Sequence, residues 1–190
     1  MASHSQRPQA ERLIIGITGR IGSGKTTVGM YLESRHGFQY LRYSAVLADW
    51  QIQDSESKDH LQKVGWEVMA GGLQAELNRR LIVQILPERN VAVDGLRHPL
   101  DYDTLRNSFL LSFRLLFIDG PPHLRFERLN TKGKYTDFAS FNLADSHPVE
   151  RQIDSLRAHA ALVIYNDGPL QNLYTIVDET VSRFRKEGQS

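Results

Sequence analysis

The sequence predicts an α/β protein in which a parallel sheet carries helices on both faces. Five short runs of β-branched and aromatic residues alternate with longer stretches whose apolar residues recur at helical spacing. A glycine-rich turn follows the first of these runs directly. Strands that alternate with helices run parallel, because each helix carries the chain back across a face of the sheet.

The length and composition fit a single globular domain. The chain has 190 residues, of which 41% are hydrophobic and 24% are charged. We expect residues 11–190 to form one domain and the polar residues 1–10 to form a disordered tail. The sequence contains no cysteine, which excludes disulfides, zinc–thiolate sites and cysteine nucleophiles.

Charge and hydropathy limit the possible partners. The formal net charge is +1, so nothing in the whole chain favours nucleic acid or a membrane surface, although a local basic cluster can still bind small anions. No apolar run approaches the roughly 18 residues of a membrane span, and the first residues lack the apolar core of a secretory signal. We therefore expect a cytoplasmic protein with small-molecule ligands and without nucleic-acid or membrane partners. No feature of the sequence indicates an oligomeric state.

The alternating pattern places the individual elements. The expected strands are Leu13–Thr18, Phe38–Tyr43, Val91–Asp94, Phe113–Ile118 and Leu162–Tyr165. The expected helices cover residues 25–35, 45–50, about 72–86 and a C-terminal stretch whose apolar face runs from Leu173 to Phe184. Ligands of such folds bind beyond the carboxyl ends of the strands, and the polar residues discussed below follow those ends.

The most specific motif is the turn between the first strand and the first helix. Residues 19–26 read GRIGSGKT and match the phosphate-binding pattern GxxxxGK[ST]. The glycines let backbone N–H groups converge on phosphate oxygens, and the start of the helix adds its positive dipole end. An accidental glycine-rich turn is the alternative, but a chance match in such a chain has a probability below about 1%. The expected nucleotide-binding residues are Gly19, Gly22, Ser23, Gly24, Lys25, Thr26 and Thr27.

Two residues of this P-loop have specific expected roles. Lys25 bridges the β- and γ-phosphates and acts in catalysis, and the hydroxyl of Thr26 binds Mg²⁺. The motif therefore predicts a bound nucleoside triphosphate with Mg²⁺. It leaves open whether the phosphate passes to water, to a protein or to a metabolite.

A carboxylate and an arginine follow the third strand. Asp94 ends the apolar run 91–94, where P-loop proteins carry an aspartate that holds Mg²⁺ or accepts a proton. The alternative is an Asp-Gly turn that caps the strand. Arg97 could bind an acceptor phosphate with its guanidinium, or could be a surface charge. We expect both residues to be catalytic, with Asp94 as a metal ligand and Arg97 also as a substrate-binding residue.

Further substrate-binding candidates follow the second strand. Arg42 and Ser44 are expected to face an incoming anion, although Ser44 could instead be the N-cap of the helix at 45–50. Residues 44–72 are expected to form an acceptor-binding arm, in which Lys58 and Lys63 are additional candidates for phosphate contacts.

A basic segment follows the fourth strand. It contains Arg125, Arg128, Lys132 and Lys134, with Gly133 at the centre of its loop. Phosphoryl transfer requires cations around the moving group, on a segment that closes and excludes water. We interpret residues 128–138 as a small lid, with a charged helix end followed by a turn as the alternative.

The last strand leads into the sequence NDG at 166–168, a common form of strand-to-helix turn. The NKxD signature that reads guanine is absent, because Gly168 and Pro169 follow Asp167. The turn therefore favours adenine, or a loosely read base, over a guanine-specific site.

Together these segments resemble the P-loop nucleoside monophosphate kinase superfamily, and within it dephospho-CoA kinases and phage-type deoxynucleoside monophosphate kinases. The segments are GITGRIGSGKTT at 16–27, YSAVLADW at 43–50, VDGLRHPLDYDTLR at 93–106, RFERL at 125–129 and IYNDG at 164–168. The resemblance implies a three-layer P-loop NTPase fold, a five-stranded sheet in the order 2-3-1-4-5, a lid, and ATP with Mg²⁺ as the donor. It places Asp94 and Arg97 at the acceptor, makes Arg128 a catalytic cation of the lid or its hinge, and puts Asn166 and Gly168 beside the adenine.

Two departures from the family pattern bear on the acceptor. Lid loops of the family carry arginines where this sequence has Lys132 and Lys134, and lysine lacks the planar fork of arginine. Dephospho-CoA kinases carry an aspartate just after the second strand, where this sequence has Ser44. We therefore expect a kinase that acts on a (deoxy)nucleoside monophosphate. A dephospho-CoA-kinase-like enzyme and a non-catalytic nucleotide-binding regulator are the alternatives.

Overall fold

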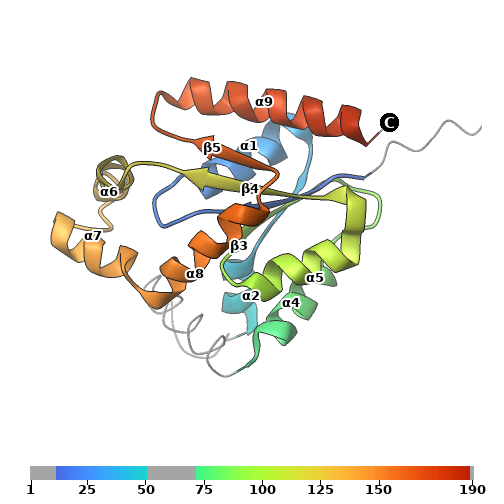
Figure 1. The fold of residues 1–190 in the computed structure, drawn as a ribbon, viewed down its shortest axis with the longest axis horizontal. Coiled ribbons are helices and arrows are strands. Elements are labelled where there is room, and N and C mark those ends of the chain that lie inside the picture. Colours follow the sequence, from blue (N-terminus) through green and yellow to red (C-terminus); the bar gives the residue numbers. More distant parts are fainter. Residues whose placement is uncertain (1–11, 51–71, 189–190) are drawn as a thin grey trace, which may run out of the picture.

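A five-stranded parallel sheet forms the centre of the molecule (Figure 1). The computed structural model describes residues 12–50 and 72–188. Its strands are β1 (Ile14–Thr18), β2 (Gln39–Arg42), β3 (Val91–Leu96), β4 (Phe113–Asp119) and β5 (Leu162–Tyr165). They lie in the order β2-β3-β1-β4-β5, and each neighbouring pair is parallel. The predicted fold class and strand order are therefore confirmed.

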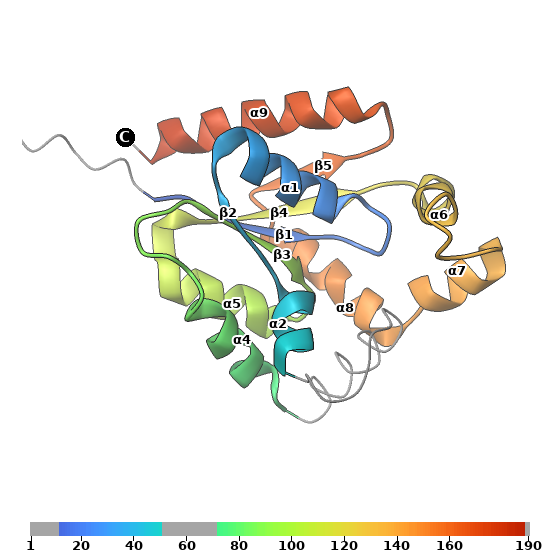
Figure 2. The same ribbon diagram turned by 180° about the vertical axis from the view of Figure 1, so that it is seen from behind.

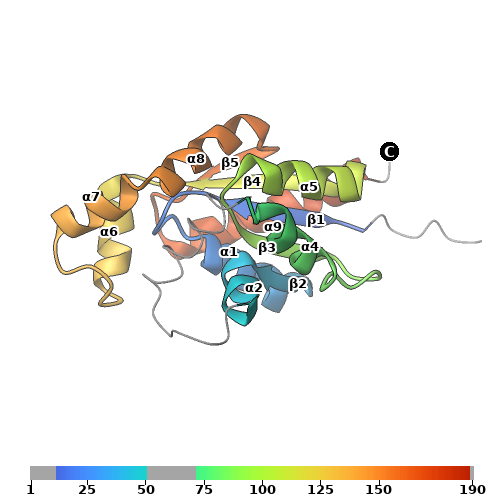
Figure 3. The same cartoon turned by 90° about the horizontal axis from the view of Figure 1, so that it is seen from below.

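Helices cover both faces of this sheet. One face carries α1 (Lys25–His36) and α9 (Leu170–Glu187), and the other carries α2 (Tyr43–Trp50), α4 (Gln74–Ile82), α5 (Pro99–Phe109) and α8 (Pro148–Leu156) (Figure 1, Figure 2). α6 (Pro122–Asn130) and α7 (Phe138–Asp145) lie beyond the carboxyl end of β4 (Figure 3). Short 3₁₀ turns occupy Leu110–Ser112 and Arg157–His159.

Each face of the sheet has its own hydrophobic core, because successive strand residues point to opposite sides. In β1, Ile14 belongs to the core beneath α4 and α5, whereas Ile15 and Ile17 belong to the core beneath α1 and α9. All five residues of β1 are buried. A strand buried on both faces reads as a continuous apolar run, which explains the sequence IIGIT at this position.

Several predicted boundaries differ from the observed ones. The second strand ends at Arg42 and α2 begins at Tyr43, so Ser44 lies inside the first turn of the helix and the N-cap interpretation is wrong. The helix predicted at 72–86 is the shorter α4, and the C-terminal helix α9 is longer than its apolar stripe. The proposed tail at 1–10 and the part of the proposed arm that contains Lys58 and Lys63 lie outside the described residues.

In the part of the chain that the structure describes, no helix combines the length and the apolar character that crossing a membrane requires.

Candidate functional site

The glycine-rich loop runs from the end of β1 to the start of α1. Gly24 is the N-cap of α1 and has φ = 107°, a backbone conformation that favours glycine. A Cβ atom at this position would also lie 2.5 Å from the side-chain nitrogen of Asn166. The loop therefore approaches its surroundings more closely than any side chain would allow, and the amides at the start of α1 offer an anion-binding terminus.

Lys25 extends over this loop. Its Nζ donates hydrogen bonds to the carbonyl oxygens of Gly19, at 2.6 Å, and Arg20, at 2.9 Å. Burial lowers the pKa of Lys25 to about 8, while the charges of Asp94 and Glu150 act in the opposite direction. A phosphate anion bound at the loop would favour the charged ammonium further.

Asp94 brings the carboxyl end of β3 to the loop. Its Oδ2 accepts hydrogen bonds from Thr26 Oγ1, at 3.1 Å, and from the hydroxyl of Tyr40, at 2.8 Å. Its Oδ1 is buried and has no hydrogen-bond partner among the described residues. Mg²⁺ prefers oxygen ligands, so an unpartnered carboxylate oxygen beside a threonine hydroxyl fits such an ion. Burial, with the charge of Asp94, raises the pKa of Tyr40 well above its usual value.

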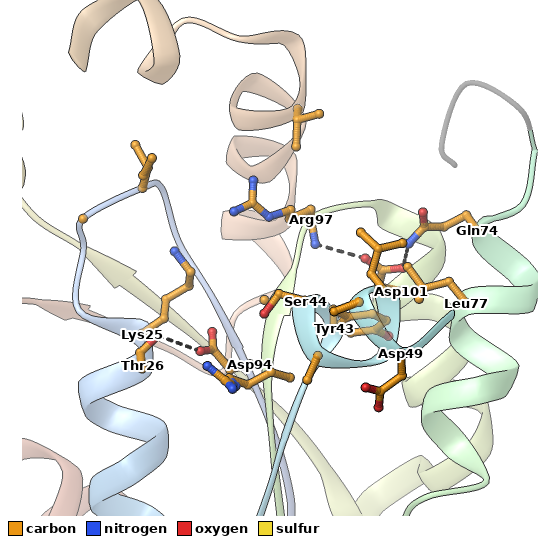
Figure 4. Close-up of a pocket in the computed structure, with 18 of the residues that line it drawn as sticks. Lys25, Thr26, Tyr43, Ser44, Asp49, Gln74, Leu77, Asp94, Arg97 and Asp101 are labelled. Atoms are coloured by element: carbon orange, nitrogen blue, oxygen red, sulfur yellow. Dashed lines mark hydrogen bonds between the residues drawn. The ribbon is translucent and has the colours of Figure 1, made fainter. Parts of the chain in front are cut away.

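A cleft of about 630 Å³ opens beside the loop at the carboxyl end of the sheet (Figure 4). Its lining combines residues from the loop, from the ends of two strands and from α2, among them Lys25, Thr26, Arg42, Ser44, Asp94 and Arg97. Ser44 points across the cleft toward Asp94, whereas the carboxylate of Asp49 points away from Lys25 (Figure 4). The structure therefore brings the residues predicted for the phosphate donor and for the acceptor into one cavity.

Arg97 is held by a buried carboxylate that sequence reasoning missed. Glu150 lies in the first turn of α8 and is completely buried. Its Oε1 accepts a hydrogen bond from Arg97 Nη1 at 2.7 Å, and its Oε2 accepts one from the backbone N–H of Ile21 at 2.8 Å. Glutamate is common three residues after an N-cap, here His147. The sequence around Glu150 therefore gave no reason to expect that it binds Arg97.

A buried polar network forms part of the cleft wall on the side of α2, α4 and α5. Asp101 accepts hydrogen bonds from the backbone N–H of Arg97 and from the side chains of Gln74 and Asn78. The hydroxyl of Tyr43 donates to Asn78 in turn. Burial raises the pKa of Asp101, and the hydrogen bonds oppose that shift. The network connects α2, α4 and α5 to the end of β3, which fixes the wall opposite the loop.

The basic segment after β4 divides between interior and cleft. Arg125 is buried and pairs with Asp145 at 2.6 and 2.9 Å, so this arginine is a structural residue and not a free lid cation. Arg128 donates to the backbone oxygen of Asn166 at 2.7 Å, which places it at the end of β5. Lys134 lines the cleft from the turn between α6 and α7. Of these three cations, only Lys134 lies where the predicted lid would act.

The turn after β5 lies against the loop. The side-chain nitrogen of Asn166 donates to the backbone oxygen of Ser23 at 2.8 Å. Gly168 follows two residues later and is exposed. Of the two residues predicted to border the base, Asn166 contacts the P-loop directly, and the role of both in base binding stays a prediction.

Acidic residues of α7 and α8 hold the other side of the loop. Arg20 pairs with Asp154 at 2.5 Å and with Asp145 at 3.2 Å. Asp145 also binds Arg125, whose Nη1 donates to the backbone oxygen of Ile21 at 3.0 Å. With Glu150, three carboxylates from residues 145–154 fix the conformation of the loop at Arg20 and Ile21.

The fold and this loop define a P-loop nucleotide-binding protein with a kinase-like architecture. Residues 15–142 match the AAA domain family, and the chain belongs to that family. A gluconokinase from Sinorhizobium meliloti 1021 superposes with a TM-score of 0.62 at 16% identity, over 94% of this chain and 96% of the gluconokinase. The protein TT1252 from Thermus thermophilus superposes with a TM-score of 0.51 at 21% identity, over 91% of this chain and 98% of its own. At these identities the likeness shows the fold alone.

Two sequence relatives differ in how much of the chain they match. A UPF0200 protein from Thermococcus onnurineus is 26% identical over 189 residues, which cover 92% of this chain and all of the relative. A dephospho-CoA kinase from Thermus thermophilus is 36% identical over 90 residues, which cover 46% of this chain and 41% of that enzyme. The chain thus resembles the UPF0200 protein along its length and the dephospho-CoA kinase over less than half.

Proposed function

We propose that the protein transfers the γ-phosphoryl group of ATP to a (deoxy)nucleoside monophosphate, with Mg²⁺ as the cofactor. The observation that carries this proposal is the single cleft that Lys25 and Thr26 line together with Asp94, Arg42 and Arg97. Phosphoryl transfer depends mainly on holding donor and acceptor in line and neutralising their charge. A cleft with a P-loop on one side and two arginines on the other supports that chemistry.

The loop residues would hold the donor. The amides at the start of α1 would bind the β-phosphate, and the ammonium of Lys25 would move from the loop carbonyls to the β- and γ-phosphate oxygens. Thr26 and Asp94 would hold Mg²⁺, which neutralises charge on the phosphates when bound. Asn166 and Gly168 would border the adenine from the turn after β5, with Arg128 close to them.

The acceptor would enter from the side of α2. Its phosphate would meet Arg97 and Arg42, and Lys134 would approach from the turn between α6 and α7. An oxygen of that phosphate would form a bond to the γ-phosphorus while the bond from the γ-phosphorus to the β-phosphate oxygen breaks. The acceptor phosphate is ionised at neutral pH, so this reaction needs no general base.

A dephospho-CoA-kinase-like reaction is the second candidate, and the partial match to the Thermus thermophilus enzyme supports it. The acceptor would then be a hydroxyl group, whose proton must leave as the new bond to phosphorus forms. The Oδ1 of Asp94, which is buried and has no hydrogen-bond partner in the described part of the chain, would accept that proton. Ser44, which points toward Asp94, has no such capacity at neutral pH.

An acceptor screen tests the proposal. ADP release from ATP with Mg²⁺ would be followed with each ribo- and deoxyribonucleoside monophosphate, with dephospho-CoA and without acceptor. Turnover with one or more monophosphates is the expected result. Turnover with dephospho-CoA alone would replace the proposal with the second candidate. Tight ATP binding without turnover on any acceptor would contradict both and favour a nucleotide-binding regulator.

We expect the Arg97→Ala variant to raise the KM of the acceptor more than that of ATP.

A further inference from the structure

The hydroxyl of Tyr40 occupies a position that the proposed transfer does not explain. Tyr40 lies in β2, while Asp94 lies in the neighbouring strand β3, and the two side chains meet at 2.8 Å. The same Oδ2 of Asp94 accepts the hydroxyl of Thr26 at 3.1 Å. Both hydrogen bonds therefore fall on one oxygen of the carboxylate, and Oδ1 is left without a partner in the described part of the chain.

The tyrosine ring reaches this position only because α1 carries a glycine beside it. A Cβ atom on Gly29 would lie 2.2, 2.6 and 2.9 Å from three carbons of the Tyr40 ring. Real Cβ atoms do not approach other atoms so closely, so the ring packs directly on the backbone of α1. Gly29 is buried in the second turn of α1, one turn after Thr26, where an alanine would otherwise favour the helix. This packing holds the ring of Tyr40 against α1, with its hydroxyl hydrogen-bonded to Asp94.

The two donors on Oδ2 are not equivalent. The hydroxyl of Thr26 is the group that a P-loop offers to a metal ion. The same hydroxyl therefore has two expected tasks, the hydrogen bond to Asp94 and the metal ion. The hydroxyl of Tyr40 has no such second task, and its ring packs directly on the backbone of α1 at Gly29. Tyr40 can hold Oδ2 whether or not Thr26 is engaged elsewhere.

We propose that Tyr40 is a positioning residue that fixes the rotation of the Asp94 carboxylate, so that Oδ1 remains the free oxygen for the metal shell of the P-loop. The inference rests on the proposed use of Mg²⁺ with ATP. It gives β2 two roles in the proposed site. Tyr40 would act at the nucleotide and its metal ion, and Arg42, two residues further along the strand, would act at the acceptor.

The test is the Tyr40→Phe variant, which keeps the ring and removes only the hydroxyl. The dissociation constant of Mn²⁺ would be measured by electron paramagnetic resonance in the presence of a non-hydrolysable ATP analogue. We expect the variant to bind Mn²⁺ about tenfold more weakly, the loss typical of one hydrogen bond to a charged group. Its affinity for the metal-free analogue is expected to stay within about twofold of the wild type.

Tyr31→Phe is the matched control. The hydroxyl of Tyr31 donates to the carboxylate of Asp178 at 3.0 Å, so the same kind of hydrogen bond is removed between α1 and α9. This control should leave the Mn²⁺ affinity unchanged. Gly29→Ala, which displaces the Tyr40 ring, should reproduce the loss of affinity and provides a second variant.

The outcomes separate this inference from the proposed function. Equal Mn²⁺ affinity in Tyr40→Phe and the wild type would overturn it, and so would an equal loss in Tyr31→Phe. Weaker Mn²⁺ binding in both Tyr40→Phe and Gly29→Ala, with unchanged binding in Tyr31→Phe, would support it. That support would hold even if the acceptor screen found no turnover, in which case the proposed kinase reaction would fail and the positioning role of Tyr40 would stand.

Discussion

Glu150 forms an ion pair with Arg97 at 2.7 Å, although 53 positions separate the two residues in the sequence. Glu150 is completely buried, and its second oxygen accepts the backbone N–H of Ile21 in the P-loop. One side chain of α8 thus connects the loop that would hold the donor to the arginine that would hold the acceptor. A buried carboxylate is costly without partners, and here both of its oxygens are satisfied by donors.

Glu150→Gln tests this connection. Both partners of Glu150 are donors, so a glutamine must turn its NH₂ group toward one of them and leave that hydrogen bond unmade. We expect kcat/KM for the acceptor to fall by about 10- to 100-fold, because Arg97 loses its orientation. Steady-state kinetics with each substrate varied in turn measure the effect. Asp154→Asn removes a carboxylate of the same helix that binds Arg20, and it should leave the KM of the acceptor unchanged. An equal rise in that KM in both variants would contradict the role of Glu150.

Lys25→Met should abolish tight ATP binding without unfolding the protein. The methionine keeps much of the side-chain volume but removes the charged donor, so we expect affinity for ATP with Mg²⁺ to fall at least about tenfold. Burial lowers the pKa of Lys25 to about 8, so the folded protein binds this proton more weakly than the unfolded chain does. Removing the charge at pH 7 should therefore leave the free energy of unfolding unchanged or raised. Calorimetry of binding and thermal unfolding would measure both, with Lys186→Ala as the distant control. Unchanged ATP affinity would refute the P-loop assignment.

Asp94→Asn should separate turnover from donor binding. The substitution is nearly isosteric but replaces one carboxylate oxygen with an NH₂ donor, so either the acceptor of the Thr26 hydrogen bond, Oδ2, or the unpartnered oxygen, Oδ1, is lost. We expect kcat to fall by at least about 100-fold, while affinity for the metal-free ATP analogue changes by less than about threefold. Asp103→Asn, at an exposed position of α5, serves as the control. If kcat does not change in Asp94→Asn, Asp94 is not part of the reaction.

The ion pair of Arg125 and Asp145 should make the free energy of unfolding depend on pH in the acid range. Burial of Asp145 acts to raise its pKa, but the hydrogen bonds and charges of Arg125 and Arg20 outweigh it and hold the pKa below the usual range. A carboxyl whose pKa is lowered on folding contributes stability above its unfolded pKa and loses it as the pH falls through the folded value. Asp145→Asn, which leaves Arg125 buried without its charge partner, should cost about 3 kcal/mol at pH 7.

Denaturant unfolding at several pH values measures that contribution. The difference in free energy of unfolding between wild type and Asp145→Asn should be constant from pH 7 to about pH 5 and shrink below about pH 4. A difference that stays constant down to pH 2 would show that the charge of Asp145 does not act on Arg125.

Local patterns predicted the parts of the site that lie close together in the sequence. Gly24, Lys25 and Thr26 could be assigned because strand, glycine turn and helix follow one another within a few residues. Asp94 could be assigned because it follows a buried run. The strand order came from the resemblance to a family and not from periodicity, because nothing in a strand's own residues says which strand lies beside it.

The residues that were missed or misread act over long distances. Tyr40 reads as an ordinary strand aromatic and Glu150 as an ordinary helix-start residue, and only their partners 54 and 53 positions away reveal what they do. Arg125 belongs to the basic segment that precedes the predicted lid, and its charge alone does not distinguish it from the lid cations. The face of α6 on which it lies points it toward Asp145 and the interior, and charge composition alone does not report the face.

The carboxylates that hold the P-loop also set the order in which the protein can assemble. The loop at 19–26 leaves the ribosome early, but Asp145, Glu150 and Asp154, which fix it, are made more than a hundred residues later. Asn166, which holds the backbone of Ser23, comes later still. A nascent chain that ends before Asp145 therefore has the complete phosphate-binding motif without these side chains. These side chains all belong to the last third of the chain, so they can hold the loop only after that part has folded back onto the first.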